Sequence, residues 1–63
     1  MAESNKRLAR VARIWQIEAE FQAELSRIYR DKGKLERAVV TQRKAAVAAE
    51  KARDAVRWLG IST

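Results

Sequence analysis

The chain has 63 residues, a formal net charge of +6 from 14 basic and 8 acidic side chains, and neither cysteine nor histidine. These numbers exclude a disulfide brace, a metal site built on thiolates or imidazoles, and acid–base catalysis by histidine. No apolar run approaches the roughly 20 residues of a membrane-spanning helix, and the amino terminus lacks the apolar segment of a secretory signal. We therefore expect a cytoplasmic protein, which the lack of cysteine also suits. Twelve alanines, two glycines and no proline favour helix, and strand signals are missing.

The first predicted helix covers residues 5–31, and Ser4 or Asn5 can cap its first free N–H groups. Apolar side chains recur at helical spacing and cover almost half of its circumference, more than one neighbouring helix can shield. These residues are Leu8, Val11, Ile14, Trp15, Phe21, Leu25, Ile28 and Tyr29, with Ile17 and Ala19 at the two edges.

The second predicted helix covers residues 35–59. Its most regular seam follows the 3–4 spacing of a heptad repeat and consists mainly of small residues, which lets two backbones approach closely. The seam is Leu35, Ala38, Gln42, Ala45, Ala49, Ala52, Val56 and Leu59. Gly60 suits the left-handed position after the last helical turn, and Ile61 would then reach Val56 as in a Schellman motif. We therefore predict that this helix ends at Leu59.

The polar stretch at residues 30–34 decides the architecture. Gly33 can end the first helix as its C′ residue, or it can cap the second helix with Glu36 at the N3 position. The alternative is one continuous helix of roughly 80 Å in a parallel coiled coil, in which Gly33 would cost only about 1 kcal/mol relative to alanine. In favour of this alternative, a series of positions spaced seven residues apart continues across the glycine and would keep one stripe on one side of the helix. These positions are 14, 21, 28, 35, 42, 49 and 56.

Three features favour a reversal of the chain. A short polar segment with glycine is typical of a helix–helix connection, and the two helices match in length. Bulky side chains on residues 5–31 would also find space against the alanines of residues 35–59, whereas a parallel coiled coil would set alanine against alanine. We therefore predict an all-α fold: a single antiparallel two-helix hairpin over residues 1–63, with its turn at about 32–34.

Apolar residues remain outside the predicted contact between the helices, and soluble monomers generally do not expose such patches. A homodimer of hairpins would cover them in a four-helix bundle with two-fold symmetry. The predicted dimer interface is Leu8, Trp15, Ile17, Ile28, Val40, Val47 and Trp58. Glu18 and Gln42 fall inside the apolar stripes, where they either fix register and oligomeric state or lie solvated at the rim.

The basic residues gather at the amino end and around the turn, on either side of an acidic middle with Glu18, Glu20 and Glu24. If two hairpins pack with their turns at opposite ends, each amino-terminal cluster approaches the partner's turn, and the crowded positive charge favours a polyanion. The alternative is that these charges only solvate helix faces. The predicted nucleic-acid-binding residues are Lys6, Arg7, Arg10, Arg13, Arg27, Arg30, Lys32, Lys34 and Arg37.

The sequence offers no catalytic or metal-binding constellation. Its hydroxyl side chains have no imidazole to activate them, Glu20 and Glu24 lack the histidine that usually completes a carboxylate metal site in a bundle, and no glycine-rich phosphate loop exists. We expect a non-enzymatic protein without a cofactor.

The first functional hypothesis is a nucleic-acid-binding regulator whose affinity comes mainly from phosphates. The second is an adaptor, inhibitor or assembly subunit that binds another protein through its apolar helix faces. A third treats residues 8–17 as a membrane-surface helix, which the acidic residues that follow disfavour. In length and expected architecture, the chain is similar to the small dimeric helical hairpins that plasmids use to bind paired RNA loops and control copy number. That likeness extends to no residue motif.

Overall fold

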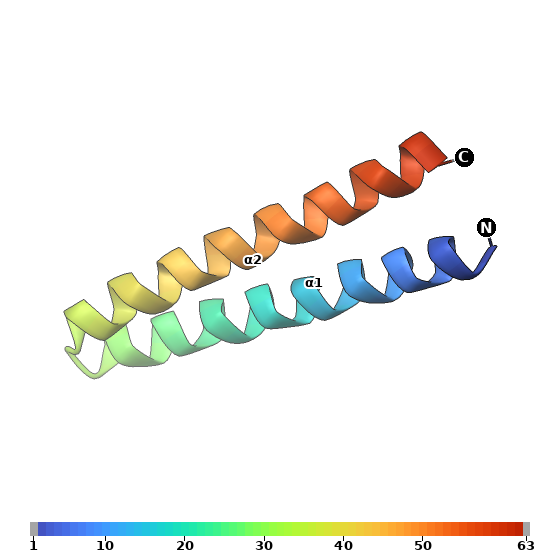
Figure 1. Ribbon diagram of the computed structural model, residues 1–63. Helices are drawn as coiled ribbons and strands as arrows, with labels where there is room; N and C mark the ends of the chain where they lie inside the picture. Colours follow the sequence, from blue (N-terminus) through green and yellow to red (C-terminus); the bar gives the residue numbers. More distant parts are fainter. Residues whose placement is uncertain (1, 63) are drawn as a thin grey trace.

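The computed structural model describes the backbone of residues 2–62 and the side chains of residues 5–61. It contains two α-helices, α1 (Ala2–Asp31) and α2 (Leu35–Ser62), joined by residues 32–34. The helices lie side by side and antiparallel, so the amino and carboxyl ends lie together at what we call the open end (Figure 1). The Cα atoms extend over 48 × 14 × 10 Å. The predicted all-α hairpin is confirmed, and the continuous helix of roughly 80 Å is wrong.

The turn is a Schellman motif centred on Gly33. This residue has a φ of 76°, and among the described residues no other has a positive φ. The Lys34 N–H donates to the Tyr29 carbonyl at 2.8 Å, and the Gly33 N–H donates to the Arg30 carbonyl at 3.0 Å. These are the two hydrogen bonds that define the motif, so Gly33 ends α1 as its C′ residue. The Lys34 carbonyl accepts from the Ala38 N–H at 3.0 Å, so Lys34 rather than Gly33 is the N-cap of α2.

Both helices extend further toward the open end than the sequence predicts. α1 begins at Ala2, so the backbone of Ser4 and Asn5 is helical and neither residue is the N-cap. α2 continues through Gly60 to Ser62, so the predicted end at Leu59 is wrong. Glycine is permitted but not required to turn left-handed, and no proline follows Gly60 to stop the helix. Each further helical residue adds a backbone hydrogen bond, which offsets the conformational cost of glycine.

The two helices touch along what we call the interhelical seam, which has the 3–4 spacing of a heptad repeat on both sides. On α1 the seam is Leu8, Ala12, Trp15, Ala19, Gln22, Ser26 and Tyr29. On α2 it is Ala38, Thr41, Ala45, Ala48, Ala52, Ala55 and Leu59. Every one of these residues is buried or half-buried, and its small members let the helix backbones approach closely.

The polar members of the seam are satisfied locally. Near the turn the Ser26 hydroxyl donates to the Ala38 carbonyl at 2.9 Å, which ties α1 to α2. The Thr41 Oγ1 lies 2.9 Å from the Arg37 carbonyl oxygen and 3.0 Å from that of Ala38, within its own helix. Among the described side chains, no buried polar atom lacks a hydrogen-bond partner. Buried hydroxyls therefore cost the hairpin little.

The seam differs from the predicted one by a rotation of α2. Positions 38, 45, 52 and 59 are shared, but positions 41, 48 and 55 replace 42, 49 and 56. The expectation that bulky residues of α1 pack against the alanines of α2 is wrong for Ile14 and Phe21, which are 56% and 53% exposed. α1 instead uses the alanine edge of its wide apolar sector, because alanine facing alanine gives the shortest distance between helix axes.

Candidate interaction surfaces

Two grooves run beside the interhelical seam. One, of about 420 Å³, is lined by Trp15, Glu18, Val40, Arg43, Lys44, Val47 and Ala48. The other, of about 550 Å³, is lined by Gln16, Ala19, Glu20, Ala49, Ala52, Arg53 and Val56. Successive helical residues are rotated by about 100°, so the residues of α1 that line the first groove and those that line the second lie on opposite sides of the seam. The hairpin therefore has two long faces of different composition.

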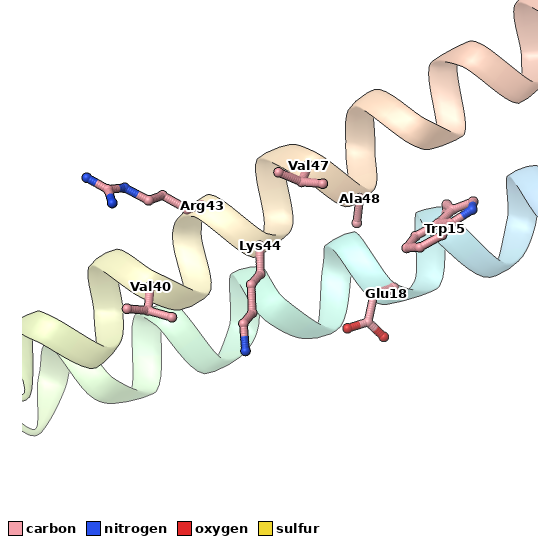
Figure 2. A pocket seen from close by; sticks show the side chains of 7 residues that line it. All are labelled: Trp15, Glu18, Val40, Arg43, Lys44, Val47 and Ala48. Atoms are coloured by element: carbon pink, nitrogen blue, oxygen red, sulfur yellow. The ribbon is translucent and has the colours of Figure 1, made fainter.

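The face with the first groove is the more apolar, and we call it the apolar face. Figure 2 shows Trp15 and Glu18 projecting from α1 and Val40, Lys44 and Val47 projecting from α2. The helical repeat adds further bulky residues to the same side of α1 as Glu18, because they stand three, four or seven positions from it or from one another. The apolar face comprises Val11, Ile14, Phe21, Leu25 and Ile28 of α1 and Val40, Val47 and Trp58 of α2.

The predicted dimer-interface residues do not all lie together. Four of them are exposed on the apolar face: Ile28, Val40, Val47 and Trp58. Leu8 and Trp15 are half-buried and belong to the interhelical seam. Ile17 is 56% exposed and lies about 200° around the helix from Trp15, so it points away from α2 at the outer edge of the apolar face, one turn from Phe21.

Four members of the apolar face were not in the predicted interface: Val11, Ile14, Phe21 and Leu25. The sequence contains a signal for them. Together with Glu18 and Ile28 they form a second stripe with 3–4 spacing along α1. The sequence predicts that this stripe contacts α2, whereas the structure leaves most of it in solvent.

Two cationic side chains of α2 cover aromatic rings of α1 at the margin of the apolar face. The Lys51 Nζ lies 4.4 Å from the centroid of the Trp15 ring, and the Arg37 guanidinium carbon lies 5.9 Å from that of the Tyr29 ring. Both distances are within the range of cation–π attraction, and the aliphatic stems shield the rings from water. These contacts hold the two aromatic residues at the seam and leave the outer part of α1 uncovered.

The two polar residues predicted to interrupt the stripes have different environments. Glu18 is half-buried beside the first groove and accepts a hydrogen bond from the Gln22 side chain at 2.8 Å. Gln42 is exposed outside the seam and accepts from the Arg30 guanidinium at 3.4 Å. Gln42 therefore lies at the rim, whereas Glu18 places a carboxylate within the apolar face.

All nine predicted nucleic-acid-binding residues are exposed. The hairpin separates them into two groups. The first group lies on the half of α1 that leads to the open end: Lys6, Arg7, Arg10 and Arg13. The second lies around the turn: Arg27, Arg30, Lys32, Lys34 and Arg37.

The fold adds Arg53 and Arg57 of α2 to the open end, far along the sequence from the amino-terminal group. The predicted hairpin already implied this proximity, but those arginines were not assigned to it. Among the described side chains one ion pair is present, between Arg57 and Asp54 at 3.7 Å, and both partners are exposed. Most of the positive charge at both ends is therefore not neutralised within the described part of the hairpin.

Among the described residues, no group of three or more His, Cys, Asp or Glu could hold a metal ion. Over the same residues, neither helix contains a stretch apolar enough to cross a membrane. No family model, curated protein or solved structure matches this chain. We therefore infer function from the two surfaces of the hairpin itself, its apolar face and its basic ends.

Proposed function

We propose that this chain is a non-enzymatic cytoplasmic regulator that homodimerises and binds the phosphate backbone of RNA or DNA through its basic ends. The observation that supports nucleic-acid binding is the exposed basic charge at both ends of the hairpin. Among the described side chains, a single ion pair neutralises part of this charge, between Arg57 and Asp54. Phosphates would relieve the mutual repulsion of these side chains and release counterions on binding.

The dimensions of the hairpin suit such a ligand. The molecule is 48 Å long, with basic groups at the turn and at the open end and acidic residues of α1 between them. With phosphates spaced about 3.4 Å apart along a strand, the two ends would contact phosphates separated by roughly a dozen nucleotides. Binding should therefore need a nucleic acid at least this long and show little preference for sequence.

Gel shifts on 20-bp RNA and DNA duplexes test the proposal. We expect a complex at low salt that weakens steeply between about 50 mM and about 200 mM salt, because phosphate contacts dominate the affinity. Arg10→Glu at the open end and Arg30→Glu near the turn should each weaken binding by roughly tenfold and reduce the salt slope by about 1.

Arg43→Glu is the matched control. It makes the same change in net charge on the middle of α2, where the Arg43 side chain extends away from α1 (Figure 2). It should weaken binding much less than either end variant, while circular dichroism and solution mass stay unchanged for all three. Absence of any shift at low salt, or equal losses for the three variants, would contradict binding through the ends.

A second candidate function is that of a protein-interaction module, such as an adaptor, inhibitor or assembly subunit. The observation in its favour is the apolar face, on which Ile14, Phe21 and Ile28 are about half exposed. An amphipathic helix of another protein could cover these side chains. This function predicts a chain that stays monomeric at millimolar concentration until the partner is added, which solution mass distinguishes from self-association.

A further inference from the structure

The apolar face of α1 carries a second heptad stripe, distinct from the interhelical seam. We call it the outer stripe, and it consists of Val11, Ile14, Glu18, Phe21, Leu25 and Ile28. Its successive members are separated by three and four residues in alternation, which is the spacing that packs two helices side by side. Within the hairpin this stripe has no helix against it, and most of its members are exposed.

The spacing of the outer stripe is the same in both directions, and its outer two pairs are apolar. Reversing it about the point midway between residues 19 and 20 exchanges Val11 with Ile28 and Ile14 with Leu25, and pairs Glu18 with Phe21. A two-fold axis requires such self-complementarity, because each residue then meets its counterpart twice. An antiparallel pair of α1 helices can therefore bury the stripe against a copy of itself.

The same axis also fits α2. The contacts Ser26–Ala38 and Trp15–Lys51 fix which residues of the two helices lie at one level. They place the midpoint on α2 between residues 45 and 46. On the apolar face, the axis then brings Arg37 opposite the partner's Asp54. Opposite charges thus meet toward each end of the α2 pair, while apolar side chains meet in the outer two pairs of the α1 stripe.

We propose that the apolar face binds a second copy of this chain in an antiparallel two-fold dimer, α1 on α1 and α2 on α2, centred between residues 19 and 20. In this register Lys44 and Lys51 lie level with the partner's Val47 and Val40. A dimer with both turns at one end would instead set these lysines against the larger Phe21 and Ile14, so more apolar surface would be buried against ammonium groups. The face extends over 48 × 14 Å at the Cα atoms, which gives roughly 700 Å² per protomer, close to the about 800 Å² of a stable interface.

This register also explains how a carboxylate can lie within the apolar face. Glu18 is paired with the partner's Phe21, and the partner's Lys44 lies at the same level on the neighbouring helix. Glu18 already accepts from Gln22 at 2.8 Å, so its second oxygen can accept from the partner's Lys44. A polar residue satisfied in one register only would select that register over its alternatives.

The dimer further predicts composite basic ends. Lys6 lies level with the partner's Gly33, so Lys6, Arg7 and Arg10 approach the partner's turn at each end of the bundle. This part of the inference rests on the proposed nucleic-acid binding, whereas the interface itself does not.

Engineered disulfides test the register, because the chain has no cysteine of its own. Ile14 and Leu25 are 11 residues apart on α1, about 16 Å along the helix, which is beyond the reach of a disulfide within one chain. In the proposed dimer Ile14 meets the partner's Leu25. A mixture of the Ile14→Cys and Leu25→Cys variants should therefore form a covalent dimer on mild oxidation, whereas neither variant should do so alone.

A mixture of Ile14→Cys with Gln16→Cys is the matched control, because Gln16 lines the second groove and lies about 200° around α1 from Ile14. It should give no covalent dimer. Two results would contradict the register but not self-association. One is cross-linking of the Ile14→Cys variant alone. The other is a dimeric solution mass together with no cross-linking in the mixture of Ile14→Cys and Leu25→Cys. A monomer at 1 mM native chain would overturn both. Nucleic-acid binding is measured separately, so its failure would not affect this result.

Discussion

Gly33 allows the chain to reverse because it adopts a φ of 76° without a steric penalty, and nothing lies within 4 Å of the position that a Cβ would take. Its importance is therefore conformational and does not come from packing. Residues with a side chain pay roughly 1–2 kcal/mol to enter the left-handed region. The two glycines of the chain have different backbone conformations: Gly33 is left-handed, whereas Gly60 lies inside α2 and is helical.

Gly33→Ala should lower the free energy of unfolding by about 1–2 kcal/mol, because alanine is strained at a positive φ. Gly60→Ala should raise it by about 1 kcal/mol, because alanine is the better helix former and nothing lies within 4 Å of a Cβ there. Urea denaturation at one fixed protein concentration compares the two variants. Equal effects of the two substitutions would contradict the different backbone conformations of these glycines.

At the scale of the helices, small side chains decide which sides of α1 and α2 meet. The buried apolar residues among those described are all alanines: Ala12, Ala38, Ala48, Ala52 and Ala55. Close approach of two backbones replaces the usual interlocking of large side chains. The hairpin core therefore tolerates no increase in volume, although it excludes little apolar surface from water.

Ala48→Leu should destabilise the hairpin by about 1–3 kcal/mol, because Ala48 is 2% exposed and the larger side chain must push the helices apart. Ala46→Leu adds the same atoms at an exposed position of α2 and should change stability by less than about 0.5 kcal/mol. Thermal unfolding followed by circular dichroism measures both. Tolerance of leucine at position 48 would show that the helices are less closely packed than the structure indicates.

At the scale of the whole molecule, the hairpin buries alanines within itself and leaves its large apolar residues outside. A chain of this size has little surface to bury, so a second copy on the apolar face would supply the large contacts that the hairpin core lacks. Folding and self-association should then be coupled, and thermal stability should rise with protein concentration.

Phe21→Glu should raise the dissociation constant of the dimer at least tenfold, equivalent to about 1.4 kcal/mol, because Phe21 lies near the proposed two-fold axis. Gln16→Glu should leave it nearly unchanged. Both residues are exposed, but Gln16 lines the second groove, so the two variants each add one negative charge to α1 and only Phe21→Glu adds it to the apolar face. Analytical ultracentrifugation measures both, and a larger effect at Gln16 would exclude the apolar face as the dimer contact.

The sequence alone determined that the chain is helical and that its basic groups form an amino-terminal and a turn cluster, and it favoured a reversal at Gly33 over one continuous helix. These properties are local: helix propensity, a glycine after a helix and charge along the chain need no knowledge of distant residues. The end of α2 was also a local prediction, yet it failed because glycine allows two conformations and the sequence does not choose between them.

Only the tertiary structure decided which side of each helix faces the other. α1 has an apolar sector wide enough for two seams of the same spacing, one through Ala12 and Ala19 and one through Ile14 and Phe21. Periodicity cannot rank two seams of equal period. Packing ranks them, because the alanine seam permits a closer approach of the backbones. The bulky seam is left on the outside, where it becomes the surface available for a partner.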